Sequence, residues 1–546
     1  MDPSAPFMTF SQSTLWLKFL ITAITLLLLY LRVRAGGGAA ARVYSLRTKV
    51  AIGLAVAFSF AVFHNLGTFR AGSFVHYGEM FHYYVGPKYF KELGYYDLYN
   101  AVIVADAEQD SSFAPLPFYT DLKSYKNLKR EAAVRDAARI KSLFSEPRWN
   151  AFKDDIAFFK SKINKPGSPD MIFLLMDHGY NGSPVSTFLL GVLTNLVPLT
   201  HVLWLALIDV ALVLLMIAIV FHTFGFEMGA LFSAYFFSSI LSGQEFLSGS
   251  LLRYDWLLYI VAAVCLLERG RHATAAFFLT LSAMLRLFPA LLFYGIAVTM
   301  FQKLRVTRKL DRQSLRFTVT AGATALLLFL LPSVTLGSVT RPWKDFYGKI
   351  SLHESGVYVN HLGFTGVALF EPSQLSLESF AARFQTRNPD IVRHWQDVKE
   401  HELRNKKPLM MFAALSVLAC VTALIWRRRE NESSSVLWPL FLIYTASYLS
   451  GYYYTFLCLF ILLFFRRPNT MSAFVPVSLL LVLNLSALLT DSFKPSPIVF
   501  YTLLNVYLFV CLAAILAFEL YTNVWKTRRA PDATEQPKPR PRPRRP

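Results

Sequence analysis

The chain has 546 residues, of which 54% are hydrophobic and only 16% are charged. Ordinary globular domains carry about 25% charged residues, so this composition excludes an ordinary soluble protein as well as disordered, collagen-like and coiled-coil chains. The formal net charge of +20 would fit nucleic-acid binding, but Lys and Arg lie in clusters between apolar runs rather than on one basic face. The sequence therefore predicts an all-α polytopic membrane protein without a nucleic-acid partner.

Apolar runs of membrane-spanning length recur along the chain. A helix needs about 20 residues to cross the hydrocarbon layer, and we expect about thirteen crossings, some of them short. They cover residues 15–32, 49–66, 201–222, 227–242, 250–268, 272–285, 287–301, 317–337, 409–426, 436–450, 451–465, 471–491 and 499–522. The short spans 272–285 and 287–301 form a hairpin, which implies a cavity that opens outward.

Basic clusters give the expected orientation. They lie at 32–49, 267–271, 302–316, 427–429, 466–467 and 526–529. The predicted spans place all of these clusters on one side of the membrane, which the positive-inside rule makes cytoplasmic. The N-terminus and the two long segments 67–200 and 338–408 then lie outside, and the C-terminus lies inside.

This topology also predicts the domain organisation. The parts are an N-terminal span with its basic loop (1–48), a main membrane module (49–337) that contains the outer segment 67–200, a second outer segment (338–408), C-terminal membrane helices (409–525) and a basic Pro- and Arg-rich tail (526–546). Within the first outer segment, the aromatic and aliphatic residues of a helix predicted at 147–163 share one face. We expect this face to pack inside a folded cap or to rest on the membrane rather than to bind substrate.

Four charged residues lie where hydrocarbon is expected, and charge there is a functional hypothesis by default. Arg253 and Asp255 either pair with each other to hold helices together or serve the reaction. Arg286 lies at the apex of the short hairpin, where a guanidinium suits bidentate capture of a phosphate at the membrane surface. Asp209 is expected to be structural or linked to proton transfer.

Glu79 is the first carboxylate after the second predicted span. Aromatic neighbours such as Tyr83 and Tyr84 would partly desolvate it, which raises the pKa of a carboxyl group toward the range of a general base. The alternative is an ordinary interfacial glutamate among the aromatic residues that line a membrane surface.

Several separated stretches together resemble the GT-C superfamily of membrane glycosyltransferases, and within it glycosyltransferase family 87, which includes polyprenol-phosphate-mannose-dependent mannosyltransferases. The stretches are GEMFHYYVGPKYFKELGYYDLY (78–99), HGYNGSPVSTFLL (178–190), GQEFL (243–247), LLERGRHA (266–273), LRLFPALL (285–292) and YVNHLGFTG (358–366). Glu79 stands where the family usually has Asp, Arg286 stands where it has Lys, and the Pro pair near Tyr180 is broken. The resemblance spans about 75–366.

The resemblance implies transfer of a sugar, mannose or another hexose or pentose, from a polyprenyl-phosphate donor to a lipid-linked or cell-envelope glycan, with inversion. The active site would face the outside of a bacterial inner membrane and need neither cofactor nor metal. The site residues that the resemblance implies are Glu79 as base, with Asp97 as second candidate; Arg286, Arg253, His361 and His353 at the donor phosphate; and Tyr83, Tyr84, Tyr180 and Gln244 in the substrate pocket.

Two other functions fit the same membrane logic. A flippase or transporter for polyprenyl-linked sugars would use an aromatic cavity and phosphate-binding arginines without a base. A polymerase or ligase for surface polysaccharide would move a whole glycan from a polyprenyl diphosphate. Two features separate these functions from the glycosyltransferase. A flippase does not require Glu79, and a polymerase or ligase uses a different donor.

Overall fold

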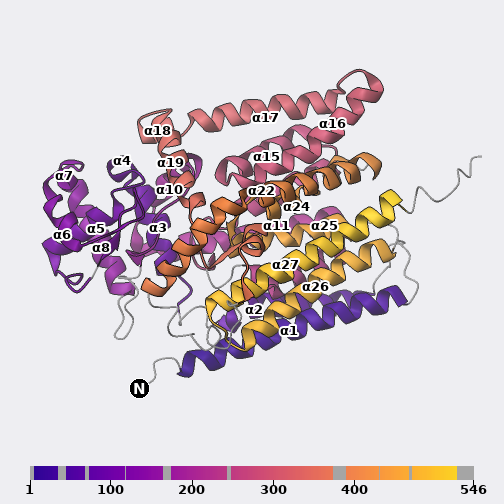
Figure 1. Ribbon diagram of the computed structural model, residues 1–546, viewed down its shortest axis with the longest axis horizontal. Coiled ribbons are helices and arrows are strands. Elements are labelled where there is room, and N and C mark those ends of the chain that lie inside the picture. The colour runs from indigo at the N-terminus through magenta and orange to yellow at the C-terminus, as the bar shows by residue number, and fades with distance from the viewer. Residues whose placement is uncertain are drawn as a thin grey trace, which may run out of the picture.

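The computed structural model describes residues 5–34, 45–67, 73–116, 118–163, 174–242, 247–372, 389–428, 431–465 and 470–525. These residues form a helical bundle with a folded cap at one end (Figure 1). The only strands among them are two short antiparallel pairs, β1 (Tyr119–Thr120) with β2 (Asn127–Leu128), and β3 (His361–Leu362) with β4 (Leu449–Ser450). The all-α membrane class predicted from composition agrees with this architecture.

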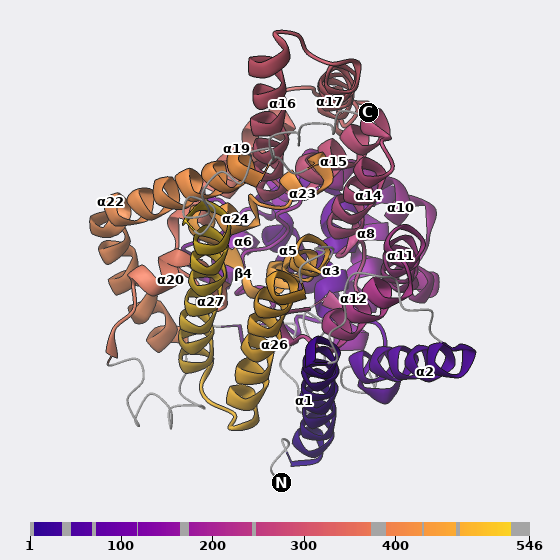
Figure 2. The same ribbon diagram turned by 90° about the vertical axis from the view of Figure 1, so that its right-hand side faces the viewer.

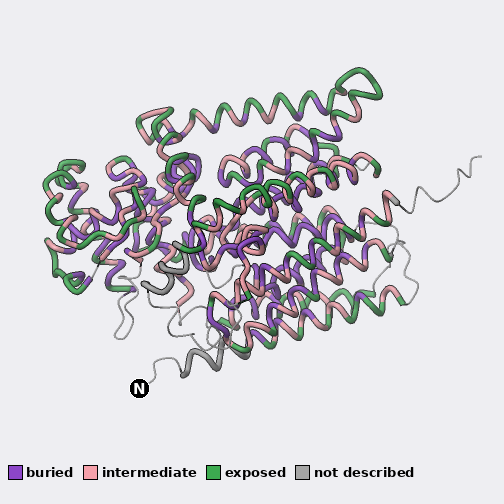
Figure 3. The backbone as a smooth tube through the Cα atoms, in the orientation of Figure 1, coloured by how far each residue is buried: buried purple, intermediate pink, exposed green. Residues whose placement is uncertain are grey.

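Seven helices of the described part are long and apolar enough to cross a membrane. They are found in α1 (Ala5–Arg34), α2 (Leu46–Phe63), α11 (Val202–Phe224), α17 (Arg312–Leu330), α22 (Pro389–Arg428), α26 (Thr470–Ser492) and α27 (Pro497–Leu520). Each matches a predicted span. Their flanks expose large apolar side chains, such as Leu27 and Leu28 on α1 and Leu326 and Leu327 on α17, which a protein surrounded by water would bury (Figure 3).

The other predicted spans are shorter helices, so the expectation of about thirteen crossings is confirmed only in part. They are α12 (Phe226–Ser238), α14 (Asp255–Glu268), α15 (His272–Leu285), α16 (Phe293–Thr307), α23 (Glu432–Ser435), α24 (Leu440–Ala446) and α25 (Leu459–Phe464), with the 3-10 segments η3 (Ile240–Ser242), η4 (Phe288–Leu292) and η7 (Gly451–Cys458). A helix of 14 residues such as α15 is about 21 Å long, which is less than the hydrocarbon thickness of about 30 Å.

The bundle buries an extensive apolar core in which α1 packs against α26 and α12, and α15 packs against α14 and α17 (Figure 2). The N-terminal end of α1 lies on the same side as the cap, whereas the α16–α17 turn and the C-terminal end of α27 lie at the opposite end (Figure 1). The remaining short elements of the bundle are η1 (Asn65–Gly67), η2 (Leu199–His201), α20 (Phe364–Ala368) and the π-helical turn η8 (Tyr521–Trp525).

The cap contains most of the described part of the first outer segment and the start of the second. Its helices are α3 (Tyr77–Lys88), α4 (Phe90–Leu93), α5 (Leu98–Gln109), α6 (Arg130–Arg135), α7 (Ala137–Ser142), α8 (Glu146–Ile163), α18 (Ser333–Leu336) and α19 (Arg341–Ser355). The predicted apolar face of α8, formed by Trp149, Phe152, Ile156 and Phe159, is buried in the cap core. Of the two alternatives for this face, the structure therefore shows packing inside the cap.

The first outer segment also contains an apolar helix that was not among the predicted spans. It is α10 (Pro184–Leu196), which starts at the N-cap Ser183 with Pro184 in its first turn, as helix starts commonly do. Helix α10 packs against α3, α15 and α19. It thereby joins the cap to the broken hairpin of the bundle, and this junction is where the charged residues meet.

Candidate functional site

Glu79 lies in the first turn of α3, at the junction between cap and bundle. The helix starts after His76, whose Nδ1 accepts a hydrogen bond from the Glu79 backbone N–H at 3.2 Å. The Glu79 carboxylate forms an ion pair with Arg253, with 3.5 Å between Oε2 and Nη2. The Arg253 side chain is 2% exposed and that of Glu79 is 26% exposed, so the carboxylate remains open to a ligand while the guanidinium is enclosed.

A close backbone approach brings these two side chains together. The backbone N–H of His76 donates to the carbonyl of Gly249 at 2.9 Å, which ties the start of α3 to the turn that leads to Arg253. Gly249 has a φ of +78°, and a Cβ atom at this position would lie 1.8 Å from the Phe74 carbonyl oxygen. Only glycine adopts this conformation without strain and allows this contact.

Asp209 on α11 holds the same turn from the bundle side. Its two carboxylate oxygens accept hydrogen bonds from the backbone N–H of Arg253 at 2.9 and 3.1 Å, and one of them accepts from Tyr254 at 3.3 Å. These bonds give Asp209 a structural contact, in agreement with one of the two roles predicted for it, whereas the role in proton transfer stays a prediction. Asp255 accepts a hydrogen bond from the Trp256 backbone N–H at 2.8 Å, and the ion pair that the structure shows for Arg253 is with Glu79 rather than with Asp255.

Arg286 is the C-cap residue of α15 and lies at the break between α15 and η4, where the sequence predicted the apex of a short hairpin. Its Nη1 donates to the Ser186 hydroxyl at 2.8 Å and to the Leu285 carbonyl at 2.9 Å, and its Nη2 lies 3.4 Å from the Leu252 carbonyl. Arg286 interacts electrostatically with Arg253. Glu79, Arg253 and Arg286 thus form one cluster, which we call the arginine site.

The arginine site contains buried donors that the described residues leave without a partner. They are Nε and Nη1 of Arg253 and Nε of Arg286. Leaving a buried charged donor unpaired is costly, and native structures rarely do so without a functional reason. Guanidinium donors match the oxygens of phosphate and carboxylate, so the site is suited to bind an anion next to the Glu79 carboxylate.

Aromatic rings enclose the arginine site. The Arg253 guanidinium lies 4.0 Å from the ring centroid of Tyr83 and 5.2 Å from that of Tyr452. Tyr83 in turn packs edge-on against Tyr180, with 5.5 Å between the ring centroids. These rings exclude water around the guanidinium, which strengthens its interaction with an anion. The prediction placed Tyr83 and Tyr180 at the substrate pocket, and both lie beside this site.

The structure places Tyr84 and Asp97 elsewhere in the cap. Tyr84 is fully buried, and its hydroxyl donates to the Val197 carbonyl at 2.9 Å. The Asp97 carboxylate is held by the Arg139 guanidinium at 2.7 and 3.2 Å. Neither contact involves the arginine site, so Glu79 is the predicted base that the structure brings to Arg253. Gln244 lies outside the described residues.

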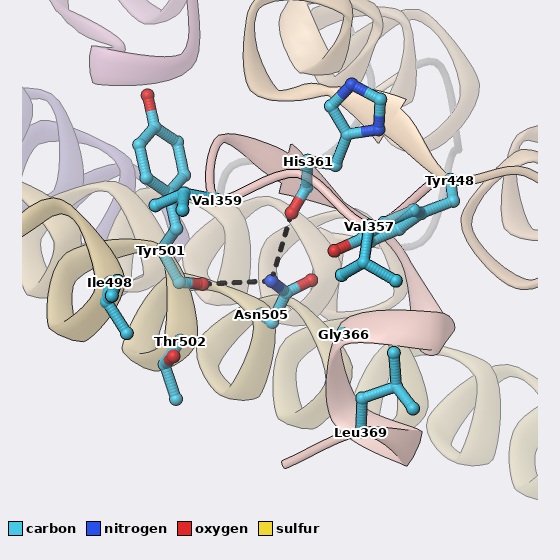
Figure 4. Close-up of a pocket in the computed structure, with 10 residues that line it drawn as sticks. All are labelled: Val357, Val359, His361, Gly366, Leu369, Tyr448, Ile498, Tyr501, Thr502 and Asn505. Atoms are coloured by element: carbon cyan, nitrogen blue, oxygen red, sulfur yellow. Dashed lines mark hydrogen bonds between the residues drawn. The ribbon is translucent and has the colours of Figure 1, made fainter. Parts of the chain in front are cut away.

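His361 and His353 lie together, with 5.4 Å between their ring centroids. The backbone of His361 borders a pocket at the end of α27, where Asn505 donates to the His361 carbonyl at 3.3 Å (Figure 4). Figure 4 shows that the imidazole points away from this pocket. The pocket offers about 20 Å³ to a water-sized molecule, which is room for one water rather than a sugar.

Three contributors to the arginine site and its surroundings were not predicted from the sequence. Ser186 and Tyr452 contact the arginines directly, and the Asp177 carboxylate lies 3.4 Å from Nδ1 of His178. The available signals were the SPVSTF start of α10 and the GYYYTF run at 451–456. No group of three or more His, Cys, Asp or Glu residues in the described part of the chain is arranged to hold a metal ion.

Comparison of the chain with protein-family models, with curated proteins and with solved structures finds no match. What the fold and the site define is the coarse class: an α-helical membrane protein, with seven helices in its described part that are long and apolar enough to cross a membrane and a charged site between the helical bundle and the cap.

Proposed function

We propose that this protein is a membrane glycosyltransferase of the GT-C type, which transfers a sugar from a polyprenyl-phosphate donor to a lipid-linked or cell-envelope glycan acceptor. The observation that carries the proposal is the arginine site: unpartnered guanidinium donors of Arg253 and Arg286 lie beside the partly exposed carboxylate of Glu79. This arrangement places an anion site beside a carboxylate that can act as general base, as transfer from a sugar phosphate requires.

The donor phosphate binds to Arg253 and Arg286 in this proposal. Its lipid chain stays in the membrane, and the position of the arginines at the junction between bundle and cap matches a phosphate that cannot leave the membrane surface. The phosphate takes the unpartnered donors first, so Arg286 keeps its bonds to Ser186 and Leu285. Arg253 is shared between the phosphate and Glu79, whose carboxylate accepts the proton.

The reaction is a single displacement. Glu79 takes the proton of the acceptor hydroxyl, and the acceptor oxygen forms a bond to the anomeric carbon from the face opposite the phosphate. The bond between that carbon and the phosphate oxygen breaks, its electron pair stays on the leaving polyprenyl phosphate, and the configuration inverts. The two guanidiniums stabilise the charge that grows on the phosphate, and such preorganised stabilisation is commonly the largest contribution to catalysis.

The proposed orientation places the cap outside the cell. The arrangement in which the N-terminal end of α1 shares a side with the cap, while the α16–α17 turn and the end of α27 lie opposite (Figure 1), supports a cytoplasmic location for the basic clusters. We assign the protein to the inner membrane of a bacterium, with the active site on the extracytoplasmic face and no metal or other cofactor.

The test is transfer from synthetic polyprenyl-phosphate mannose, arabinose, glucose and galactose in proteoliposomes that contain a bacterial lipid-glycan extract as acceptor. We expect release of polyprenyl phosphate from one of these donors. Glu79→Gln should reduce turnover about a hundredfold or more, because a positioned base contributes roughly 10²–10⁴-fold, while donor binding persists. Glu131→Gln, on the exposed surface of α6, is the matched control and should retain full activity.

The same experiment separates the alternatives. Full activity of Glu79→Gln contradicts the assignment of the base. Movement of labelled lipid across the bilayer without sugar release from any donor contradicts the transferase and favours the flippase. Release only from a polyprenyl-diphosphate glycan favours the polymerase or ligase.

A further inference from the structure

A second polar cluster lies where the first outer segment meets the second. The ring of His178 contacts that of Tyr125 at 4.5 Å and that of Tyr358 at 4.7 Å between centroids. Tyr358 stacks on His353 at 4.6 Å with an interplanar angle of 17°. The ring centroid of His361 lies 4.7 Å from that of Tyr358. Side chains from both outer segments therefore form one group of packed rings. We call this group, which consists of Tyr125, His178, His353, Tyr358 and His361, the histidine cluster.

Asp177 lies beside this cluster, at the surface of the protein. Its side chain is 56% exposed, yet it interacts electrostatically with His82 and Lys349, whose side chains are 4% and 0% exposed. The exposed carboxylate therefore lies at the edge of the cluster, with the buried side chains of His82 and Lys349 behind it. The Nδ1 atom of His178 lies 3.4 Å from the Asp177 carboxylate.

The cluster offers neutral hydrogen-bonding groups that have no partner among the described residues. The Nδ1 atoms of both His353 and His361 are buried and unpaired. Burial lowers the pKa of His353 to about 3, so its imidazole is neutral at pH 7 and presents one donor and one acceptor. Such groups pair with hydroxyls, whereas the nearby Asp177 carboxylate repels phosphate.

The histidine cluster adjoins the arginine site. Tyr99 interacts electrostatically with both Asp177 and Glu79, and buried His82 interacts with both Asp177 and Arg253. Tyr99 and His82, which are both buried and share a hydrogen bond of 2.9 Å, therefore link the cluster to the arginine site. The two sites differ in charge character, since one has unpartnered cationic donors and the other has neutral imidazoles and a carboxylate.

We infer that the histidine cluster binds the sugar ring of the acceptor, and that the acceptor is a neutral, hydroxyl-rich glycan. Asp177 accepts hydrogen bonds from sugar hydroxyls, His353 and His361 supply the complementary donors and acceptors, and the partly exposed ring of His178 offers apolar surface to the sugar C–H groups. The role of this sugar as acceptor rests on the proposed function. The binding of a neutral sugar to the cluster can be measured without any transfer reaction.

The test is saturation-transfer NMR on the full chain in lipid nanodiscs, with the methyl glycosides of mannose, arabinose, glucose and galactose as probes. The wild-type protein should transfer saturation to at least one glycoside. Asp177→Asn should weaken that binding about tenfold or more, since hydrogen bonds to a charged group contribute roughly 1.5–3 kcal/mol. His353→Phe, which keeps a stacking ring but removes both nitrogens, should do the same. Asp154→Asn on the exposed face of α8 is the matched control.

The outcomes separate this inference from the proposed function. Equal binding in Asp177→Asn and wild type, no saturation of any neutral glycoside, or saturation only of an added amino sugar each overturns the neutral-sugar site. Glycoside binding that depends on Asp177, in a protein that releases no polyprenyl phosphate from any donor, supports the site and contradicts the transferase. Loss of glycoside binding in Glu79→Gln with Asp177 intact contradicts the separation of the two sites.

Discussion

Gly249 joins the start of α3 to the turn that carries Arg253, and its replacement tests whether this joint builds the arginine site. In Gly249→Ala, the new Cβ would lie 1.8 Å from the Phe74 carbonyl oxygen, far inside van der Waals contact. Positive φ costs an L-residue about 1–2 kcal/mol, and overpacking a rigid backbone costs about 1–3 kcal/mol more. We expect a total loss of roughly 2–5 kcal/mol in stability.

Gly337→Ala isolates the second of these contributions. Gly337 has nearly the same φ, +74°, but a Cβ there meets nothing within 4 Å. Both variants share the backbone strain and the smaller entropy of the unfolded chain, so their difference reports the collision with Phe74. The assay is thermal unfolding in detergent micelles, followed by tryptophan fluorescence. Equal unfolding temperatures for the two variants would refute the reasoning.

Further variants probe the two sites and the cap. Arg286→Ala should weaken binding of labelled polyprenyl phosphate about tenfold or more, because a charge-assisted pair contributes roughly 1.5–3 kcal/mol, and should change glycoside binding less. Asp106→Asn should destabilise the cap by about 3 kcal/mol in thermal unfolding, since it leaves buried Lys160, 2.6 Å away, without this partner. Burial lowers the pKa of Lys349 to about 7, so the unfolded chain binds its proton more tightly. The free energy of unfolding should therefore increase between pH 7 and about pH 10. In Lys349→Met this increase should be smaller by roughly 3 kcal/mol.

Each of these has a matched comparison. Arg312→Ala, an exposed arginine on α17, should leave lipid binding unchanged, and an unaltered affinity in Arg286→Ala would count against the phosphate site. Glu131→Gln serves as the control for Asp106→Asn, and similar unfolding of the two would show that the Lys160 pair is not structural. A pH dependence of unfolding in Lys349→Met that equals the wild type would remove Lys349 as its source.

Patterns within single segments predicted much of the fold. The apolar spacing of 147–163 located the buried face of α8, and the short halves around Arg286 predicted the break that the structure shows between α15 and η4. Helical periodicity identifies a face because it depends only on neighbouring residues. It did not identify α10, whose 13 residues are too few for a membrane span.

The pairing of charges was less accessible from sequence. Arg253 is two residues from Asp255, so a local pair was a natural alternative, yet Arg253 meets Glu79. This contact depends on the Gly249 joint and on Asp209, which bind the turn from two distant helices. Tyr84 and Tyr83 are adjacent on α3, and only the packed cap decides that one faces Val197 while the other covers Arg253. Contacts between residues far apart in the sequence therefore determine these pairings, which local sequence patterns did not predict.

The arginine site draws on residues that leave the ribosome at widely separated times. Glu79 emerges first, Arg253 follows after α11, and Tyr452 appears only when most of the chain has been made. Until η7 is in place, one face of the Arg253 guanidinium lacks its ring cover, and a charge in that state is costly within the membrane. In the orientation proposed above, Glu79 crosses the membrane before Arg253 inserts, so we expect Arg253 to meet its counterion before the ring of Tyr452 covers it.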